Sequence, residues 1–98
     1  MPQLESTFQA SLIREIRDRF DGAIVIKNDP NYIQGFPDLL ILFGKHWAAL
    51  EVKQNDKSRH RPNQDYYVNF LNNMSFASFI HPDNKEEVLD AMERSFQA

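Results

Sequence analysis

The 98-residue sequence contains no cysteine. This absence excludes disulfide scaffolds and zinc sites built from thiolates, and it is typical of proteins from a reducing compartment. No apolar run approaches the ~20 residues that a helix needs to cross a membrane. The N-terminal residues MPQLESTFQ lack the charged and then apolar pattern of a secretion signal. We therefore expect a soluble protein that works in the cytoplasm and does not bind a membrane.

Glycine and positive charge are also scarce. With three glycines there is no glycine-rich phosphate-binding loop, and the three histidines do not have the spacing of metal ligands. Eleven Lys and Arg residues against fourteen Asp and Glu residues give a net charge of -3, which argues against a general nucleic-acid coat protein. However, the segment 53–61, KQNDKSRHR, contains four of the eleven basic residues and one acid. The sequence is therefore compatible with a local basic patch on an acidic domain.

The sequence contains enough apolar and aromatic residues for one packed domain over residues 1–98, with no repeat or linker. Its hydrophobic periodicity and turn residues predict seven elements in the order α-β-β-β-α-β-α. They are a helix over 3–20, strands over 23–28, 38–43 and 46–53, a helix from 61 or 62 to 74, a strand over 75–80 and a helix from about 83.

Two of the predicted strands are apolar on both faces. The runs DLLILF and AALEV have this pattern, which is typical of strands covered by helices on both sides of a sheet. We therefore expect an α/β fold in which a mixed four-stranded sheet is flanked by helices. On the helix that follows the polar loop 54–60, the stripe predicted to face the sheet is Tyr67, Phe70, Leu71 and Met74.

Three charged residues interrupt the apolar strands. Asp38 stands at the start of the second strand, and Glu51 and Lys53 lie two residues apart near the end of the third, so these two point to the same face. The tight turn at residues 44–45 brings the start of one strand beside the end of the other, so the three side chains should converge. Two neighbouring carboxylates repel each other unless a cation lies between them. Oxygen ligands of this kind suit Mg²⁺ or Mn²⁺.

A plainer interpretation is open for the same residues. Asp38 could be a turn residue, with Glu51 and Lys53 as an exposed ion pair at a strand end. The apolar neighbours of this pair argue against it, because burying uncompensated charge is costly. A lysine beside a metal can hold or activate a water molecule and stabilise developing negative charge. The three residues therefore predict metal-dependent hydrolysis of a phosphodiester.

This pattern resembles the PD-(D/E)xK nuclease superfamily. The signature here is Pro37-Asp38, twelve intervening residues and then Glu51-Val52-Lys53, on a hairpin between helices. Within the superfamily, the chain is most similar to the stand-alone VRR-Nuc domains of phages and bacteria, through GFPD at 35–38, EVK at 51–53 and Gln64. Holliday-junction resolvases and phage endonucleases that cut branched DNA are similar in size and layout. The resemblance covers nearly the whole chain and implies a restriction-endonuclease-like core.

The resemblance also implies a Mg²⁺-dependent endodeoxyribonuclease in which Mn²⁺ can substitute. Asp38, Glu51 and the backbone carbonyl of Val52 would hold the metal. Lys53 would position or deprotonate the attacking water, and the products would carry a 5′-phosphate and a 3′-hydroxyl. Gln64 would orient water or backbone phosphate; the alternative is a first-turn residue that bonds its own backbone.

The first predicted helix adds another acid. Glu5 falls within the arc of the apolar residues from Phe8 to Phe20, so its side chain should face the protein. Members of the resembled family carry a first-helix glutamate that completes the metal site, which implies this role for Glu5. Glu15 is the competitor at the edge of the arc, and a frayed terminal acid is the alternative for Glu5.

Several residues are candidates for contacts with the substrate. Lys27, near the end of the first strand, could contact phosphate or be a solvated strand end. Tyr32, in the long loop, could stack on a base or pack under that loop. The residues after the third strand predict a mobile phosphate-binding loop, or alternatively an ordinary solvated loop: Lys57, Arg59, His60 and Arg61.

The expected substrate follows from the size of the chain. A domain of 98 residues has no separate module for reading sequence, so we expect structure-selective cutting of branched DNA, such as four-way junctions in recombination and repair. By family analogy, a homodimer would place two sites on paired strands of a two-fold symmetric junction. The alternatives are a nuclease acting on other DNA forms or on RNA, and a nucleic-acid-binding module of the same fold without catalysis. If the chain is encoded by a phage, its compartment would be the host cytoplasm.

Overall fold

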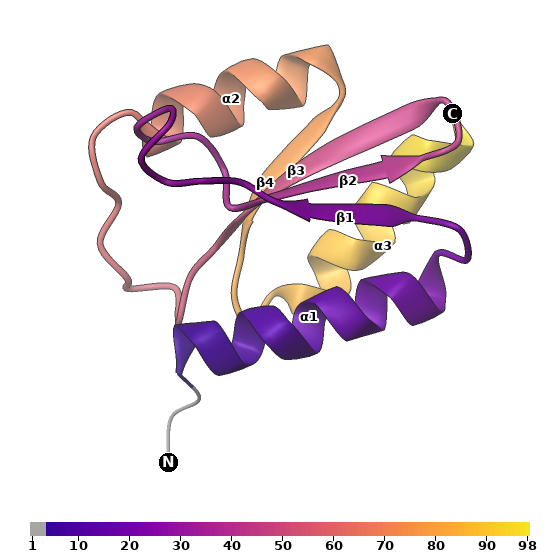
Figure 1. The fold of residues 1–98 in the computed structure, drawn as a ribbon, viewed down its shortest axis with the longest axis horizontal. Helices are drawn as coiled ribbons and strands as arrows, with labels where there is room; N and C mark the ends of the chain where they lie inside the picture. The colour runs from indigo at the N-terminus through magenta and orange to yellow at the C-terminus, as the bar shows by residue number, and fades with distance from the viewer. Residues whose placement is uncertain (1–3) are drawn as a thin grey trace.

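The computed structural model describes residues 4–98, which form three helices and a four-stranded sheet (Figure 1). The elements are α1 (Glu5–Arg19), β1 (Ile24–Lys27), β2 (Leu39–Phe43), β3 (His46–Val52), α2 (Gln64–Met74), β4 (Phe76–Ile80) and α3 (Lys85–Gln97). Every predicted element is present, in the predicted order, with bounds that differ by no more than three residues. The predicted helix start at residue 3 lies outside the described residues. Within residues 4–98, no helix combines the length and the apolar character needed to span a membrane.

The sheet is mixed, as predicted. Its strand order is β1-β2-β3-β4, in which β1, β2 and β3 are antiparallel and β4 runs parallel to β3. Parallel neighbours need a crossover connection, and α2 provides it between β3 and β4. The predicted α/β fold, a mixed four-stranded sheet flanked by helices, is therefore confirmed.

Helices cover both faces of the sheet, as the apolar strands predicted (Figure 1). The larger core lies between the sheet and the pair α1 and α3, and Leu50 and Val52 of β3 point into it. The smaller core lies under α2 on the opposite face and includes Ala49. Because side chains alternate along a strand, Glu51 and Lys53 fall on the same face as Ala49. The charged residues of β3 therefore point toward α2.

The buried face of α2 differs from the predicted stripe. Its buried residues are Gln64, Val68 and Leu71, whereas 51% of Phe70 and 62% of Met74 is exposed. At about 100° per residue, Phe70 lies far from the arc centred on Gln64 and Leu71, and Met74 lies at its edge. The helix packs over β3 and β4, and the side chains of Phe70 and Met74 remain exposed to solvent. The prediction that Phe70 and Met74 face the sheet was therefore wrong.

Candidate active site

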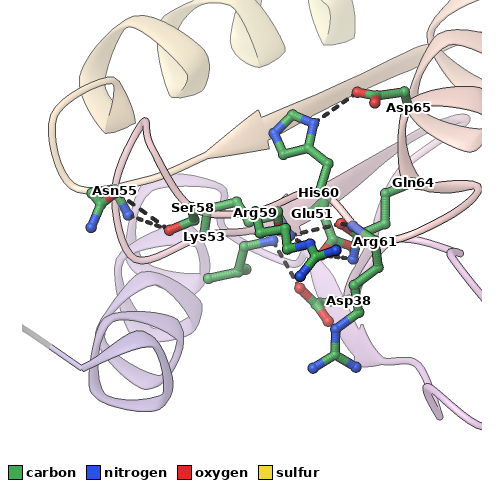
Figure 2. Close-up of polar contacts among 11 residues, drawn as sticks. Asp38, Glu51, Lys53, Asn55, Ser58, Arg59, His60, Arg61, Gln64 and Asp65 are labelled. Carbon is green, nitrogen blue, oxygen red and sulfur yellow. Dashed lines mark hydrogen bonds and ion pairs between the residues drawn. The ribbon is translucent and has the colours of Figure 1, made fainter.

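An open cleft of about 1320 Å³ lies where β2 begins and β3 ends. Leu39 pairs with Leu50 in the antiparallel hairpin, so Asp38, one residue before β2, comes to lie beside Glu51. Asp38, Glu51 and Lys53 all line the cleft (Figure 2). The structure therefore brings together the three charged residues that the sequence singled out.

Asp38 is held by backbone groups on both sides. Its Oδ2 atom accepts a hydrogen bond from the backbone N–H of Val52 at 2.8 Å. Its own backbone carbonyl accepts one from the N–H of Asn28 at 2.8 Å. The N–H and C=O groups of a strand residue point to the same side, so the carbonyl of Val52 points toward the Asp38 side of β3. This edge of the sheet thus carries two kinds of oxygen donor.

Glu51 is an acid inside the protein, with 3% of its surface exposed. Its Oε2 atom accepts a hydrogen bond from Nε2 of Gln64 at 2.9 Å and lies 3.7 Å from Nζ of Lys53. Its Oε1 atom is buried and has no hydrogen-bond partner among the described residues. When Glu51 is ionised, a buried oxygen without a partner is costly. A cation or a hydrogen-bond donor brought by a ligand would remove that cost.

The environment of Glu51 disfavours its charge. Burial, the negative charge of Asp38 and a hydrogen bond between the two carboxyl groups together raise the pKa of Glu51 from 4.5 to about 8. The ammonium of Lys53 opposes this rise, and the carboxylate of Glu5 adds a smaller increase in the pKa. At neutral pH without a metal, Glu51 therefore carries a proton, which a metal ion would replace because ligating carboxylates are ionised.

Lys53 is also buried, with 6% of its surface exposed. Its Nζ atom donates hydrogen bonds to Oε1 of Gln64 at 2.7 Å and to the backbone carbonyl of Arg59 at 3.0 Å. An ammonium has three N–H groups, so one is left to face Glu51 or an incoming oxygen atom. The side chain is thus held in place with one donor to spare.

Gln64 links the charged residues to α2 (Figure 2). Its Oε1 atom accepts a second hydrogen bond, from the backbone N–H of Arg61 at 2.8 Å. Gln64 therefore bonds the backbone next to its own helix, as one sequence interpretation predicted, and it also contacts Glu51 and Lys53. Its predicted role in orienting water or phosphate stays a prediction. In this structure, Gln64 is a residue that positions the two charged groups.

The two glutamates on α1 differ in position. Glu5 lines the cleft, although its side chain is exposed and does not face the core as expected. Glu15 instead accepts a hydrogen bond from Nζ of Lys85 at 2.7 Å, and it does not line the cleft. Glu5 is therefore the glutamate of α1 that lies near Asp38 and Glu51.

The oxygen atoms of the cleft fit a hard divalent cation. Within residues 4–98, no group of three or more His, Asp or Glu side chains is arranged to hold a metal. Mg²⁺ in proteins is commonly held by one or two carboxylates and completes its coordination with water and substrate phosphate. Asp38, Glu51 with its unpartnered Oε1 atom, and the carbonyl of Val52 are the groups that could hold it, with Glu5 at the rim.

The segment 54–63, called the strap below, connects β3 to α2 and forms one wall of the cleft. Lys57, Arg59 and Arg61 of the strap line the cleft. In the described part of the chain, none of these three side chains forms a salt bridge. Their positive charges are therefore available to an anion in the cleft.

His60 lies among these basic residues on the strap but points away from the cleft (Figure 2). Its ring stacks on Phe79 with 4.1 Å between the ring centroids, and its Nδ1 atom lies 2.8 Å from Oδ1 of Asp65. The sequence placed His60 with the phosphate-binding residues. The structure gives it a different place, as an anchor that fixes the middle of the strap to β4 and α2.

Lys27 and Tyr32 also differ from one another in position. Lys27 is exposed opposite Leu39 at the end of β1 and does not line the cleft. Tyr32 has 84% of its surface exposed, so the alternative in which it packs under the loop is excluded. Tyr32 lines a smaller hollow next to the cleft.

Two contacts of the cleft walls were not expected from the sequence. One is the hydrogen bond from Lys53 to the carbonyl of Arg59, for which no sequence signal exists because every residue has a carbonyl. The other is the close approach of Gly35 to Asn63, where a Cβ atom on Gly35 would lie 2.6 Å from that of Asn63. Both residues have positive φ, of 87° and 73°. Glycine and asparagine adopt such angles most readily, so a signal for this contact was present.

The chain was also compared with known proteins. No protein-family model, no curated protein and no solved structure matches it. The side chains of the cleft and their contacts are therefore the basis on which a function can be proposed.

Proposed function

We propose that this protein is a metal-dependent nuclease that hydrolyses phosphodiester bonds in DNA, with its active site in the cleft. The observation that carries the proposal is the grouping of Asp38, Glu51 and Lys53 at one edge of the sheet, where the buried carboxyl group of Glu51 lies next to a second carboxyl group. A structural ion pair of Glu51 and Lys53 would not need a second carboxylate beside it. Asp38 instead raises the pKa of Glu51, after the larger effect of burial.

The proposed metal is Mg²⁺, for which Mn²⁺ can substitute. Asp38, Glu51 and the carbonyl of Val52 would hold it, with help from Glu5. When bound there, the ion supplies positive charge that offsets the charge of the phosphate and makes a water molecule more acidic. The hard oxygen donors of the cleft support this choice over softer metals, which prefer nitrogen and sulfur.

The side chains around the metal position have separate roles in the proposal. The free N–H of Lys53 directs the attacking water or donates to a phosphate oxygen, and Gln64 keeps Lys53 and Glu51 apart. Arg59 and Arg61 bind neighbouring phosphates. The water oxygen forms a bond to phosphorus in line with the bond that breaks, which is the one to the 3′ oxygen. The water proton leaves to solvent and the 3′ oxygen takes up a proton, which gives a 5′-phosphate and a 3′-hydroxyl.

The substrate proposed is branched DNA, such as a four-way junction, cut by a homodimer during recombination or repair in the cytoplasm. An open cleft of about 1320 Å³ exceeds the roughly 300–1,000 Å³ of small-molecule pockets, which favours a segment of a polymer. Its basic strap favours a polyanion. A two-fold symmetric junction matches the symmetry of a dimer.

A cleavage assay tests the proposal. Labelled four-way junction, flap, plain duplex, single-stranded DNA and RNA are offered to the protein in Mg²⁺, in Mn²⁺ and in EDTA. The test variant is Lys53→Met, which keeps the length of the buried side chain and removes its charge. The matched control is Lys45→Met, because Lys45 is exposed in the turn at the other end of the β2–β3 hairpin.

We expect metal-dependent cutting of the junction that is lost in Lys53→Met and kept in Lys45→Met. Equal cutting of all substrates would support the proposed nuclease activity and contradict the proposed preference for branched DNA. Binding of DNA without cutting, in a folded wild-type protein supplied with metal, would favour a binding module instead. Size measurement with and without junction DNA tests the dimer, and a monomer under both conditions would contradict it.

A further inference from the structure

A smaller hollow of about 390 Å³ lies in the loop between β1 and β2. Three of its five lining side chains are large and aromatic or aliphatic, and the other two are polar: Tyr32, Ile33, Phe36, Asn28 and Asp29. The ring of Tyr32 is almost fully exposed, as reported above, although burial of an aromatic ring is favourable. The loop therefore presents an aromatic surface that the fold itself does not use.

The hollow adjoins the cleft at Phe36. Phe36 lines both, residues 30–31 and 34–35 face the cleft, and residues 28–29 and 32–33 face the hollow. Asn28 connects the hollow to the start of β2 by two hydrogen bonds. Its side chain donates to the backbone carbonyl of Pro37 at 2.8 Å, and its backbone N–H donates to the backbone carbonyl of Asp38. A strand with a phosphate at Asp38 would thus have its neighbouring nucleotide next to the hollow.

The balance of charge differs between the two sites, because four basic and three acidic side chains line the cleft, whereas one acid and no basic residue line the hollow. The cleft contains the basic residues of the strap, whereas the charged residue of the hollow is Asp29, whose Oδ1 atom accepts a hydrogen bond from the N–H of Asn31 at 2.8 Å. A carboxylate repels a phosphate group and accepts hydrogen bonds from the N–H groups of a base. The cleft therefore suits the backbone of a nucleic acid, and the hollow suits a flat, uncharged aromatic group with polar edges.

We infer that the hollow holds an unpaired nucleobase, stacked on Tyr32, next to the phosphate in the cleft. This inference rests on the proposed nuclease function and narrows its substrate class. A base within a duplex is stacked on both faces and paired along its edge, so it must leave the stack before it can enter such a site. The enzyme therefore requires a single-stranded nucleotide beside the scissile phosphate, as at a flap, a fork or an open junction.

Tyr32 is the residue to change, because its ring is exposed and supports no core. Phe36 is unsuitable, because it packs edge-on against Tyr67 with 5.6 Å between the ring centroids. Tyr66 provides the matched control: it is also an exposed tyrosine, on α2, and it lines neither the cleft nor the hollow. Tyr32→Phe keeps the stacking ring and serves as the conservative variant.

Binding is measured in EDTA, where no metal-dependent cleavage interferes. The probes are a labelled single-stranded oligodeoxynucleotide, a strand of the same length made entirely of abasic nucleotides, and a blunt duplex. Stacking contributes about 1–3 kcal/mol per base, so we expect the wild type to bind the strand with bases roughly tenfold more tightly than the abasic strand. Tyr32→Ala should lose this difference without binding the abasic strand more weakly. Tyr32→Phe and Tyr66→Ala should retain it.

Equal effects of Tyr32→Ala on both strands, or no effect on either, would overturn the base site and leave the nuclease proposal intact. A wild-type protein that binds neither strand would overturn the base site, and cleavage in Mg²⁺ would then decide the nuclease proposal separately. Base-dependent binding by a protein that cuts no substrate in Mg²⁺ would support a base-binding site in the hollow and contradict the proposed nuclease activity. A wild type that binds the blunt duplex as tightly as the single strand would also overturn the inference.

Discussion

Gln64 holds Glu51 and Lys53 with the two ends of one amide group. Its Nε2 atom donates to Oε2 of Glu51 at 2.9 Å, and its Oε1 atom accepts from Nζ of Lys53 at 2.7 Å. The carboxylate and the ammonium consequently stand 3.7 Å apart and do not form a short direct hydrogen bond. This separation leaves one oxygen of Glu51 and one N–H of Lys53 for a metal ion and a substrate.

Gln64→Met should impair both catalysis and stability. Methionine has a similar length but no polar atoms, so Glu51 and Lys53 lose a partner each and close onto one another. Leaving buried polar groups without partners costs about 1–3 kcal/mol of unfolding free energy. The rate should fall at least tenfold, because Lys53 and Glu51 are no longer held in the positions that water and metal require; tenfold corresponds to about 1.4 kcal/mol of activation free energy. Steady-state kinetics and urea unfolding measure the two effects.

The control is Gln97→Met, at the exposed end of α3. Cleavage by Gln64→Met at the wild-type rate would show that the contacts of Gln64 with Glu51 and Lys53 do not contribute to catalysis.

Without metal, the protein should lose stability as the pH rises from 4.5 to about 8. Burial, and next the charge of Asp38, raise the pKa of Glu51 across this range. Glu51 binds a proton more tightly in the folded protein than in the unfolded chain. This difference stabilises the folded protein fully below the unfolded-state pKa of 4.5, and the contribution is lost as the pH rises through the folded-state pKa of about 8. The slope for one group is at most about 1.4 kcal/mol per pH unit. Urea unfolding in EDTA at several pH values measures it. Glu51→Gln should flatten the slope, and an unchanged slope would contradict the assignment.

Binding of Mg²⁺ near neutral pH should release about one proton for each ion bound. The pKa of Glu51 is raised, by burial first, to about 8, so its carboxyl group is protonated until the metal arrives. Calorimetry in two buffers with different enthalpies of protonation counts the protons released. Glu51→Gln should bind the metal weakly and release none. Heats that are identical in both buffers for the wild type would mean that Glu51 is already ionised or is not a ligand.

The sequence predicted the parts of the site that depend on local geometry. Strand alternation and the short hairpin were enough to bring Asp38, Glu51 and Lys53 together, because both are properties of neighbouring residues. The buried face of α2 was misjudged at Phe70, because the orientation of a helix depends on which strands it covers. The direction of His60 depends equally on distant partners, and no periodicity within the strap reveals them.

His60→Ala should loosen the strap. The ring of His60 stacks on Phe79 and bonds Asp65, and this anchor lies between Arg59 and Arg61. Without it, the strap should be more accessible to trypsin, which cleaves after lysine and arginine in mobile segments. We expect several-fold faster cleavage in the strap and weaker DNA binding at unchanged metal affinity.

The control for this experiment is His46→Ala. His46 also stacks on an aromatic ring, that of Phe96, with 6.0 Å between the centroids, at the other end of the hairpin. It should leave tryptic cleavage of the strap unchanged. If both variants are cleaved equally fast in the strap, the effect is general destabilisation and His60 is no specific anchor.

Gly35→Ala should destabilise the protein more than Gly22→Ala does. Both glycines have nearly the same positive φ, of 87° and 88°, so an alanine suffers a similar backbone penalty of roughly 1–2 kcal/mol at either position. A Cβ atom on Gly22 meets nothing within 4 Å, whereas one on Gly35 would lie 2.8 Å from the carbonyl oxygen of Pro62 and closer still to Asn63. Crowding of this kind adds about 1–3 kcal/mol. The difference in unfolding free energy between the two variants, measured in urea, gives the cost of crowding between Gly35 and the strap. Equal losses of stability would show that the strap can move away from Gly35 with little loss of free energy.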